Sequence, residues 1–498
     1  MCRVCDSMRS LEGDGQRLQS ETPGERFLSR LADGHVNSPV ENYAMPTGSG
    51  EAGKRVLIRG GHVMTMDPEL GDFAVGDVLI EGHAITAVAP RIDVSDAEVI
   101  NARGRIVMPG FVDTHHHQFE TALRSMLPNG LLSGNGGEEG QPNYLEHVLG
   151  KLAPVYRPED VYISELFGSL SQLDAGVTTV LDVSQIHHSP EHSDAAISGL
   201  FDAGRRSVFG FFEGAGPQTQ YPEDVTRLRR QYFSSDEQLV TMIMGGEIYL
   251  PNYERSWALA QDLSMRIALH VVGAMGMGPQ MEALARAGRI TSSHLLIHMT
   301  GMSDVTWSAV AEAGASISLS TPIEMSMRHG MPPILKAREL GVPVSLSSDV
   351  ECTMTADFFT QMRSTVTLQR ALVNELALSG SDDLPRLMTS REVLRDATLG
   401  GAKALGLDGK IGTISPGKAA DLILLDGGAI NVSPLNNVPG AVVTLMERSN
   451  VETVLVNGRI RKWMGKLIDV DYQRLNAALV SSRDSLLERA GLVHGLFD

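Results

Sequence analysis

The feature that most constrains the fold is the regular alternation of strand-like and helix-like segments between about Phe111 and Gly400. Short apolar runs in this region alternate with helical patterns such as SELFGSLSQLDAG and QMEALARAG. Such alternation is typical of repeated βα units, in which helices join parallel strands and pack on the sheet. The length of the region suits one closed barrel of eight units. We therefore predict an α/β fold with a (β/α)8 TIM-like barrel over residues 109–400.

The segments on either side of this region have a β-like pattern instead. Runs such as RVLIRGGHVMTM precede it and runs such as VETVLVNGRIRKWMGK follow it, with glycine-rich turns between them. This pattern predicts short strands. We expect residues 53–108 and 401–465 to form one small β-sandwich domain built from both ends of the chain. Residues 1–52 lack an apolar period, which predicts a flexible leader. An amphipathic pattern near the other end of the chain predicts a C-terminal helix within residues 466–498.

Composition argues against several classes of partner. The 498-residue chain carries 42 Lys and Arg against 60 Asp and Glu, for a formal net charge of −18. Nucleic acids and anionic membranes need basic patches, so neither is expected as a partner. No apolar run reaches the ~20 residues of a membrane-spanning helix, and the N-terminus lacks a signal-peptide core, so we expect a cytoplasmic protein. Three cysteines are too few for a disulfide framework.

The segment IVMPGFVDTHHHQFETALR, residues 106–124, ends a strand-like run in three consecutive histidines. Because side chains alternate between the two faces of a strand, His115 and His117 point the same way and His116 points oppositely. Two imidazoles one strand repeat apart can converge on one cation. For this motif taken alone, a solvated polar patch at a strand end is the alternative interpretation.

Three later strand-like runs also end in metal-binding residue types. SMRIALHVVG carries His270, SSHLLIHMTG carries His298, and GVPVSLSSDVE carries Asp349. In a parallel βα barrel the strand C-termini share one face, where functional groups from different strands collect. Imidazole nitrogens and one carboxylate suit Zn²⁺ or Fe²⁺. The sequence therefore predicts a metal site on this face of the barrel.

These motifs resemble the amidohydrolase superfamily, in particular the branch that contains cytosine and S-adenosylhomocysteine deaminases and triazine hydrolases. The motifs PGFVDTHHH, LDAGVTTVLD and ATLGGAKALGLDGKIGTISPGKAADLILLD carry the resemblance, which covers residue 54 to about residue 465. It implies one divalent metal per chain, Zn²⁺ or alternatively Fe²⁺. The metal ligands that it implies are His115, His117, His270 and Asp349. It also implies that His298 orients or polarises the substrate and that Asp349 handles protons.

The sequence departs from this branch at Gly273. Deaminases of the branch usually carry His-x-x-Glu on the fifth barrel strand, but here the run is HVVGAMG, so a glycine stands three residues after His270. Glycine supplies no proton, and we expect the missing side chain to leave space beside the metal. Other residues are candidates to compensate, although each can also be a solvated or structural group. They are Glu247 as an acid, His329 in a lid, and Glu324, His187 and His188 as substrate-binding residues.

We therefore predict a metal-dependent hydrolase that acts on a C–N bond of a small cyclic amidine, amide or substituted heterocycle. A metal-bound hydroxide would attack the electrophilic carbon, while Asp349 moves the proton and His298 steadies the developing charge. The alternative, raised by Gly273, is that the same metal barrel catalyses a non-hydrolytic cyclisation, elimination or decarboxylation. Two-metal members of the superfamily that this sequence resembles usually bridge their ions with a modified lysine on the fourth barrel strand. The corresponding run here, LVTMIMGGEIYL, has no lysine, so the resemblance implies one metal. The expected partners are a small-molecule substrate and further copies of the chain in a homo-oligomer.

Overall fold

The computed structural model describes residues 44–134, 142–493 and 495–496. Residues 1–43, which make up most of the predicted leader, lie outside the described residues. The remaining leader residues, 44–52, pack on a sheet: the backbone amides of Thr47 and Gly48 donate hydrogen bonds to the Glu98 carboxylate at 2.8 and 2.9 Å. Packing of the chain therefore begins before the expected boundary at residue 52.

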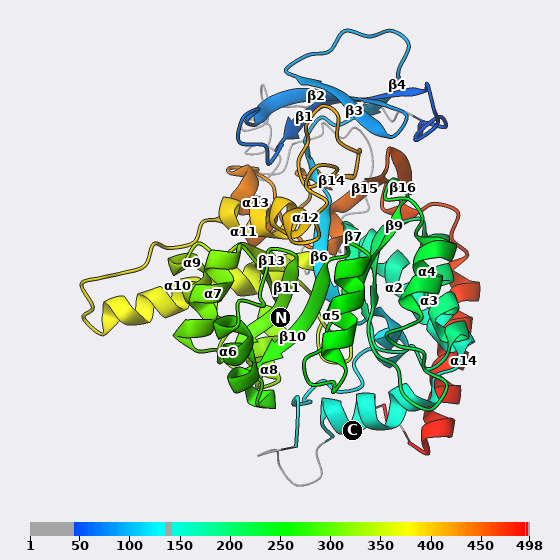
Figure 1. Ribbon diagram of the computed structural model, residues 1–498. Helices are drawn as coiled ribbons and strands as arrows, with labels where there is room; N and C mark the ends of the chain where they lie inside the picture. Colours follow the sequence, from blue (N-terminus) through cyan, green and yellow to red (C-terminus); the bar gives the residue numbers. More distant parts are fainter. Residues whose placement is uncertain (1–43, 135–141, 494, 497–498) are drawn as a thin grey trace, which may run out of the picture. The chain divides into compact units, whose positions relative to one another are not determined.

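Eight parallel strands form the barrel, and each one pairs with the next along the chain (Figure 1). All eight residues of the second strand, VTTVLDVS, are buried, as expected for a strand that is covered on both faces. The barrel closes where the amide of Asp349 donates to the carbonyl of His115 and the amide of His117 donates to the carbonyl of Asp349, both at 2.9 Å. The strands are β6 (Phe111–His116), β7 (Val177–Ser184), β8 (Arg206–Phe211), β9 (Val240–Gly245), β10 (Ile267–Val272), β11 (His294–Thr300), β12 (Ser316–Leu319) and β13 (Val344–Leu346).

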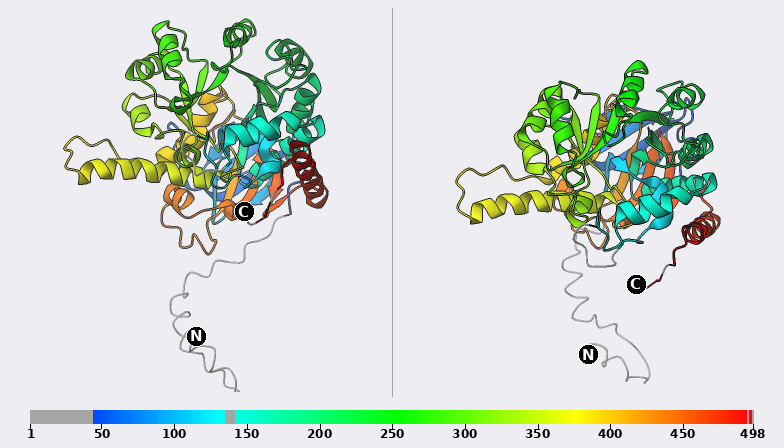
Figure 2. Two further views of the ribbon diagram at one scale, coloured as in Figure 1. Left: turned by 90° about the horizontal axis from the view of Figure 1, so that it is seen from below. Right: turned by 60° about the horizontal axis from the view of Figure 1, so that its bottom comes forward.

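Helices join these strands and cover the outside of the barrel (Figures 1 and 2). Local sequence explains several of their starts, because side chains there satisfy free backbone amides. Ser303 accepts a hydrogen bond from Thr306 at the start of α7, and Asp357 accepts one from Thr360 at the start of α10. The helices are α2 (Pro158–Asp174), α3 (Pro190–Ala203), α4 (Val225–Tyr232), α5 (Tyr253–Asp262), α6 (Gly278–Arg286), α7 (Asp304–Ala313), α8 (Thr321–Ser326), α9 (Ile334–Glu339) and α10 (Phe358–Leu378). In Figure 2, α10 projects beyond the barrel.

Strands from both ends of the chain form a second, mixed sheet. Residues 105–109 of β5 pair antiparallel with residues 422–426 of β14. Ile58, Val107 and Leu424 bring apolar side chains from both chain segments into one core. The strands are β1 (Arg55–Val63), β2 (Phe73–Glu81), β3 (Ala84–Ala89), β4 (Glu98–Asn101), β5 (Arg105–Pro109), β14 (Leu422–Asp426), β15 (Val451–Val456), β16 (Arg459–Trp463) and β17 (Lys466–Leu467). The predicted eight-fold barrel with a smaller β-domain built from both chain ends is confirmed.

The C-terminal part of the chain returns to the barrel. Its last helix packs on α2, where Asp160 accepts hydrogen bonds from Ser482 at 2.7 Å and Arg489 at 2.5 Å. The helices of this part are α11 (Ser390–Arg395), α12 (Gly401–Ala404), α13 (Val438–Thr444) and α14 (Tyr472–Ala490). Within the described residues, every helix is too short or too polar to cross a membrane.

Candidate metal centre

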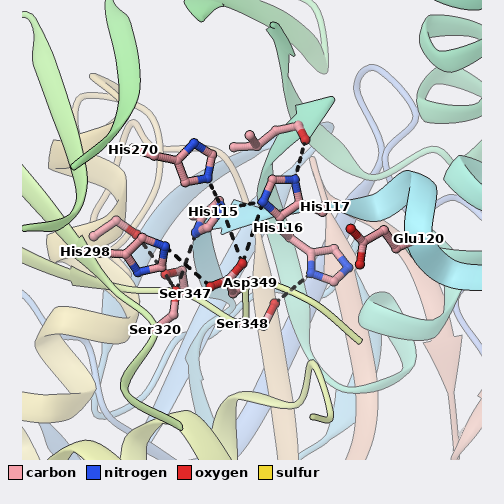
Figure 3. Close-up of polar contacts among 12 residues, drawn as sticks. His115, His116, His117, Glu120, His270, His298, Ser320, Ser347, Ser348 and Asp349 are labelled. Carbon is pink, nitrogen blue, oxygen red and sulfur yellow. Dashed lines mark hydrogen bonds and ion pairs between the residues drawn. The ribbon is translucent and has the colours of Figure 1, made fainter. Parts of the chain in front are cut away.

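Five side chains from four strand ends of the barrel converge on one point (Figure 3). His115 and His117 come from the end of β6, His270 from β10, His298 from β11, and Asp349 from the segment after β13. The Nε2 atom of His115 lies 3.0 Å from Nε2 of His117 and 3.1 Å from Nε2 of His270. Asp349 Oδ1 lies 3.6 and 3.7 Å from the first two nitrogens, and its Oδ2 lies 3.5 Å from His298 Nε2.

An unusual backbone positions two of these side chains. His298, Met299 and Asp349 have φ angles of 70°, 56° and 64°, in the left-handed region that non-glycine residues seldom adopt. The register between β10 and β11 also shifts at this point, and such an irregularity turns a side chain to a new direction. Strained conformations of this kind cluster at functional sites, where the surrounding structure holds them in place.

The outer ring nitrogens of two histidines are already occupied. Nδ1 of His117 donates to the carbonyl of Val183 at 3.0 Å, and Nδ1 of His270 contacts the carboxylate of Glu247 at 2.6 Å. Both rings therefore direct Nε2 toward the cluster. Burial lowers the pKa of His115 and His117 well below the usual value, so these rings are neutral and can bind a metal. Burial also raises the pKa of Glu247, and its contact with His270 opposes this effect.

The donor atoms of the cluster fit a divalent cation. Nitrogen lone pairs that face one another at about 3 Å repel, and a cation between them turns this repulsion into attraction. Four ligands at about 2.0–2.1 Å in a tetrahedron lie roughly 3.3 Å apart. His115 Nε2 lies 3.0 to 3.6 Å from the Nε2 atoms of His117 and His270 and from Asp349 Oδ1. Asp349 Oδ2 is buried and has no hydrogen-bond partner among the residues that the structure describes. The donor set of imidazole nitrogens and one carboxylate suits zinc or iron(II).

Glu324, which the sequence analysis assigned to substrate binding, does not line the cavity beside the cluster. It lies behind His298, whose Nδ1 is 3.0 Å from Glu324 Oε1, and the amide of Ser320 donates to the same oxygen at 2.9 Å. Glu324 thus has no contact with the cavity in this structure, and its role in substrate binding stays a prediction. The carboxylate orients His298, because the short helix α8 turns it back toward β11.

His187 and His188 do not line the cavity either. His187 Nδ1 lies 2.9 Å from the hydroxyl of Ser193, and His188 Nε2 lies 2.8 Å from the carbonyl of Ala153. Both rings therefore contact the loop after β7 and its surroundings in this structure, and their role in substrate binding stays a prediction. The residue of this loop that does line the cavity is Gln185, directly after the strand.

Gly273 borders backbone instead of open space. A Cβ atom at this position would lie 2.8 Å from the carbonyl oxygen of Thr300 and 3.0 Å from Cα of Gly301. The expectation that the missing side chain leaves room beside the metal is therefore wrong. The glycine allows β10 and β11 to approach each other closely, just beyond His270 and His298.

A narrow cavity of about 50 Å³ opens beside the cluster. Its lining combines apolar and polar side chains, with no lysine or arginine among the described lining residues. The residues are His117, Leu132, Tyr144, Leu145, Leu149, Gln185, Tyr249, His270, Val272, Met275, His298, His329 and Asp349. His329 was a candidate from the sequence, whereas Tyr144, Gln185 and Tyr249 were not. The position of Gln185, a polar residue directly after a buried strand run, could have indicated that it lies at the cavity.

Residues 106–461 match the model of the amidohydrolase family. The chain belongs to the amidohydrolase family. A 5'-deoxyadenosine deaminase from Methanosarcina barkeri is 25% identical over 461 residues, which are 87% of this chain and 99% of the relative.

Two solved structures of this amidohydrolase fold are similar over most of the chain. An adenosine deaminase from Xanthomonas campestris with bound zinc has a TM-score of 0.76 and 24% identity, covering 87% of this chain and 98% of the other. An atrazine chlorohydrolase from Arthrobacter aurescens, in complex with zinc and atraton, has a TM-score of 0.74 and 22% identity, covering 86% and 100%. The prediction of an amidohydrolase-type hydrolase is confirmed, and the non-hydrolytic alternative gains no support from these relatives.

Proposed function

We propose that this amidohydrolase binds one zinc ion, with iron(II) as the alternative, and hydrolyses a C–N bond of a small cyclic amidine, amide or substituted heterocycle. The proposed metal ligands are His115, His117, His270 and Asp349. The observation that carries the proposal is the convergence of their donor atoms within 3.0–3.7 Å of His115 Nε2 or His117 Nε2, at the wall of a cavity.

When bound, the metal makes a water molecule nucleophilic at neutral pH, because it lowers the pKa of water from about 15.7 to about 7. Asp349 is the nearest carboxylate, and it is proposed to accept the proton of the attacking water and to return it to the leaving nitrogen. His298 has its Nδ1 against Glu324 and its Nε2 next to Asp349, so it presents one nitrogen to the cavity. Its proposed role is to orient the substrate and to steady charge as the attacked carbon becomes tetrahedral.

The relatives support a heterocyclic substrate with an exocyclic leaving group. The Methanosarcina relative is named for 5'-deoxyadenosine, and a further relative from Pelotomaculum thermopropionicum, 26% identical over 444 residues, is a 5-methylthioadenosine/S-adenosylhomocysteine deaminase. The apolar part of the cavity lining, which includes Leu145 and Leu149, suits an uncharged ring. Because the cavity is narrow, exposed side chains such as Tyr249 and Met275 must turn aside when a ring enters.

A substrate screen with zinc-loaded protein tests this proposal. Amino-substituted heterocycles and cyclic amides are incubated with the protein, and ammonia release and product mass are followed together. Release of ammonia from an intact ring marks deamination, and a product heavier by one water marks ring opening. The matched control is Asp349→Asn, in which we expect turnover to fall ~10²–10⁴-fold. Turnover without uptake of water would refute the hydrolytic proposal and favour the non-hydrolytic alternative.

We also propose that the enzyme is cytoplasmic and works as a homo-oligomer. The net charge of −18 argues against nucleic acid or an anionic membrane as a partner. Exposed leucines on the projecting end of α10, Leu376 and Leu378, support contact between copies. Light scattering of the purified protein tests the oligomer, and a mass equal to one chain would refute it.

A further inference from the structure

His329 lines the cavity beside the candidate metal centre and is almost completely buried. Its side chain forms part of the same wall as His117, His270 and His298, and 5% of the residue is exposed. The centroid of its ring lies 4.8 Å from that of His298, whose Nε2 lies 3.5 Å from Asp349 Oδ2. A ligand that reaches the metal centre through this cavity therefore comes within reach of the His329 ring.

Backbone contacts fix the position of His329. The hydroxyl of Thr300, at the end of β11, donates a hydrogen bond to the carbonyl of His329 at 2.7 Å. Gly330 follows with a φ of 124°, a conformation that favours glycine, and a Cβ atom there would lie 3.1 Å from Cβ of Thr300. The loop after α8 is therefore held against the strand that carries His298, and this contact does not need the His329 ring.

The hydroxyl and amide donors of the cavity wall are already engaged within the protein. The hydroxyl of Tyr144 donates to Glu120 at 2.7 Å, and the hydroxyl of Tyr249 donates to Glu213. The amide nitrogen of Gln185 donates to Glu213 at 2.9 Å and to the oxygen of Tyr249 at 3.1 Å. These three lining side chains therefore have no hydrogen left for a ligand.

The Nδ1 atom of His329 has no such partner. Nδ1 of each of the three other histidines in the wall contacts a carbonyl or a carboxylate, whereas Nδ1 of His329 is buried and without a hydrogen-bond partner among the described residues. A buried polar atom without a partner is costly, so it marks a place where a ligand or water completes the structure. Burial lowers the pKa of His329 to about 3, so the ring is neutral and carries one N–H group.

We propose that His329 determines substrate specificity by donating an N–H hydrogen bond to an acceptor of the heterocycle, a ring nitrogen or a carbonyl oxygen. This inference rests on the proposed function, which places the substrate in this cavity. Cyclic amidines, amides and nitrogen heterocycles all present such acceptors, and Tyr144, Gln185 and Tyr249 cannot serve them. A ring without an acceptor leaves the N–H group of His329 unpaired.

Binding of two uncharged rings of the same shape tests this assignment. 2,4,6-Trimethoxy-1,3,5-triazine has a ring nitrogen on every side, so its orientation in the cavity does not matter, and 1,3,5-trimethoxybenzene has C–H groups in their place. Calorimetry with zinc-loaded protein measures both affinities, and their ratio is compared between wild type and variants. The ratio removes the difference in hydration of the two free rings, because that difference is the same for every variant.

His329→Phe keeps an aromatic ring and removes both nitrogens. We expect the affinity ratio of triazine to benzene ring to fall at least about fivefold, which corresponds to about 1 kcal/mol for one hydrogen bond. The matched control is Tyr249→Phe, which also removes a polar group from the cavity wall. Because the hydroxyl of Tyr249 is engaged with Glu213, this variant should keep the wild-type ratio within about twofold.

His329→Ala carries the test if the phenyl ring does not fit, because the hydrogen bond from Thr300 is to the backbone carbonyl and remains. Circular dichroism and zinc content check every variant. An unchanged ratio in His329→Phe and His329→Ala would overturn the assignment. An equal fall in Tyr249→Phe would overturn it as well, and so would a wild type that does not bind the triazine.

The outcome is separable from that of the proposed function, because ammonia release and product mass are followed with the same proteins. If the ratio depends on His329 but no heterocycle is hydrolysed, the specificity role stands and the hydrolase proposal fails. If C–N bonds are hydrolysed and the ratio does not depend on His329, the hydrolase proposal stands and the specificity role fails.

Discussion

Replacing Glu247 by Gln should weaken zinc binding without unfolding the protein. Glu247 is fully buried, its Oε1 lies 2.6 Å from Nδ1 of His270, and both carboxylate oxygens lie 3.2 Å from the amide nitrogen of His270. Glutamine keeps the shape and one acceptor oxygen but removes the negative charge that makes the imidazole a better donor to the metal. Loss of such a partner typically lowers metal affinity 10–100-fold, or by about 1.4–2.8 kcal/mol.

The matched control is Glu324→Gln. Glu324 stands behind His298 as Glu247 stands behind His270, and both carboxylates contact Nδ1 of the ring, at 3.0 and 2.6 Å. Because His298 is not a proposed ligand, Glu324→Gln should lower kcat while its zinc affinity stays within about threefold of the wild type, a difference below 1 kcal/mol.

Competition with a chromophoric chelator measures both affinities, and circular dichroism checks the fold of each variant. The pH must be the same throughout, since protons compete with zinc for imidazole. Equal losses of zinc affinity in the two variants would show that His298 is a ligand and would refute the proposed set. Wild-type affinity in Glu247→Gln would show that the contact with His270 does not tune the metal.

Further outcomes are expected for the metal, for Asp349 and for Gly273. Metal analysis should find about one divalent ion per chain, and two ions per chain would contradict the mononuclear site. Removal of the metal by a chelator should abolish turnover, and added zinc should restore it. Asp349→Asn should lower turnover ~10²–10⁴-fold, or roughly 3–5 kcal/mol in the barrier, and near-normal turnover with bound metal would remove this residue from proton transfer. Gly273→Ala should cost roughly 1–3 kcal/mol of unfolding free energy in urea, because its Cβ meets the Thr300 carbonyl at 2.8 Å. Gly278→Ala, whose Cβ would have its nearest neighbour at 4.0 Å, should change stability by less than about 0.5 kcal/mol, and equal losses would refute the packing argument.

The barrel and the histidine cluster could be predicted from the sequence because both depend on short-range regularities. Strand side chains alternate, so His115 and His117 had to share a face, and parallel strands end at one face of a barrel, so His270, His298 and Asp349 had to approach them. His116 likewise lies apart from the cluster, with its Nδ1 3.0 Å from the hydroxyl of Ser348 (Figure 3). These relations follow from local geometry repeated along the chain.

The tertiary structure alone decided what lies around the cluster. After a strand ends, no period in the sequence tells which way the chain turns, so the sequence did not show that His187 packs against Ser193 while Gln185 lines the cavity. Glu324 was placed behind His298 by the turn of α8, and Gly273 was found against the backbone of Thr300, a contact between neighbouring strands. Such contacts join residues far apart in the chain, and their geometry depends on packing that local patterns do not encode.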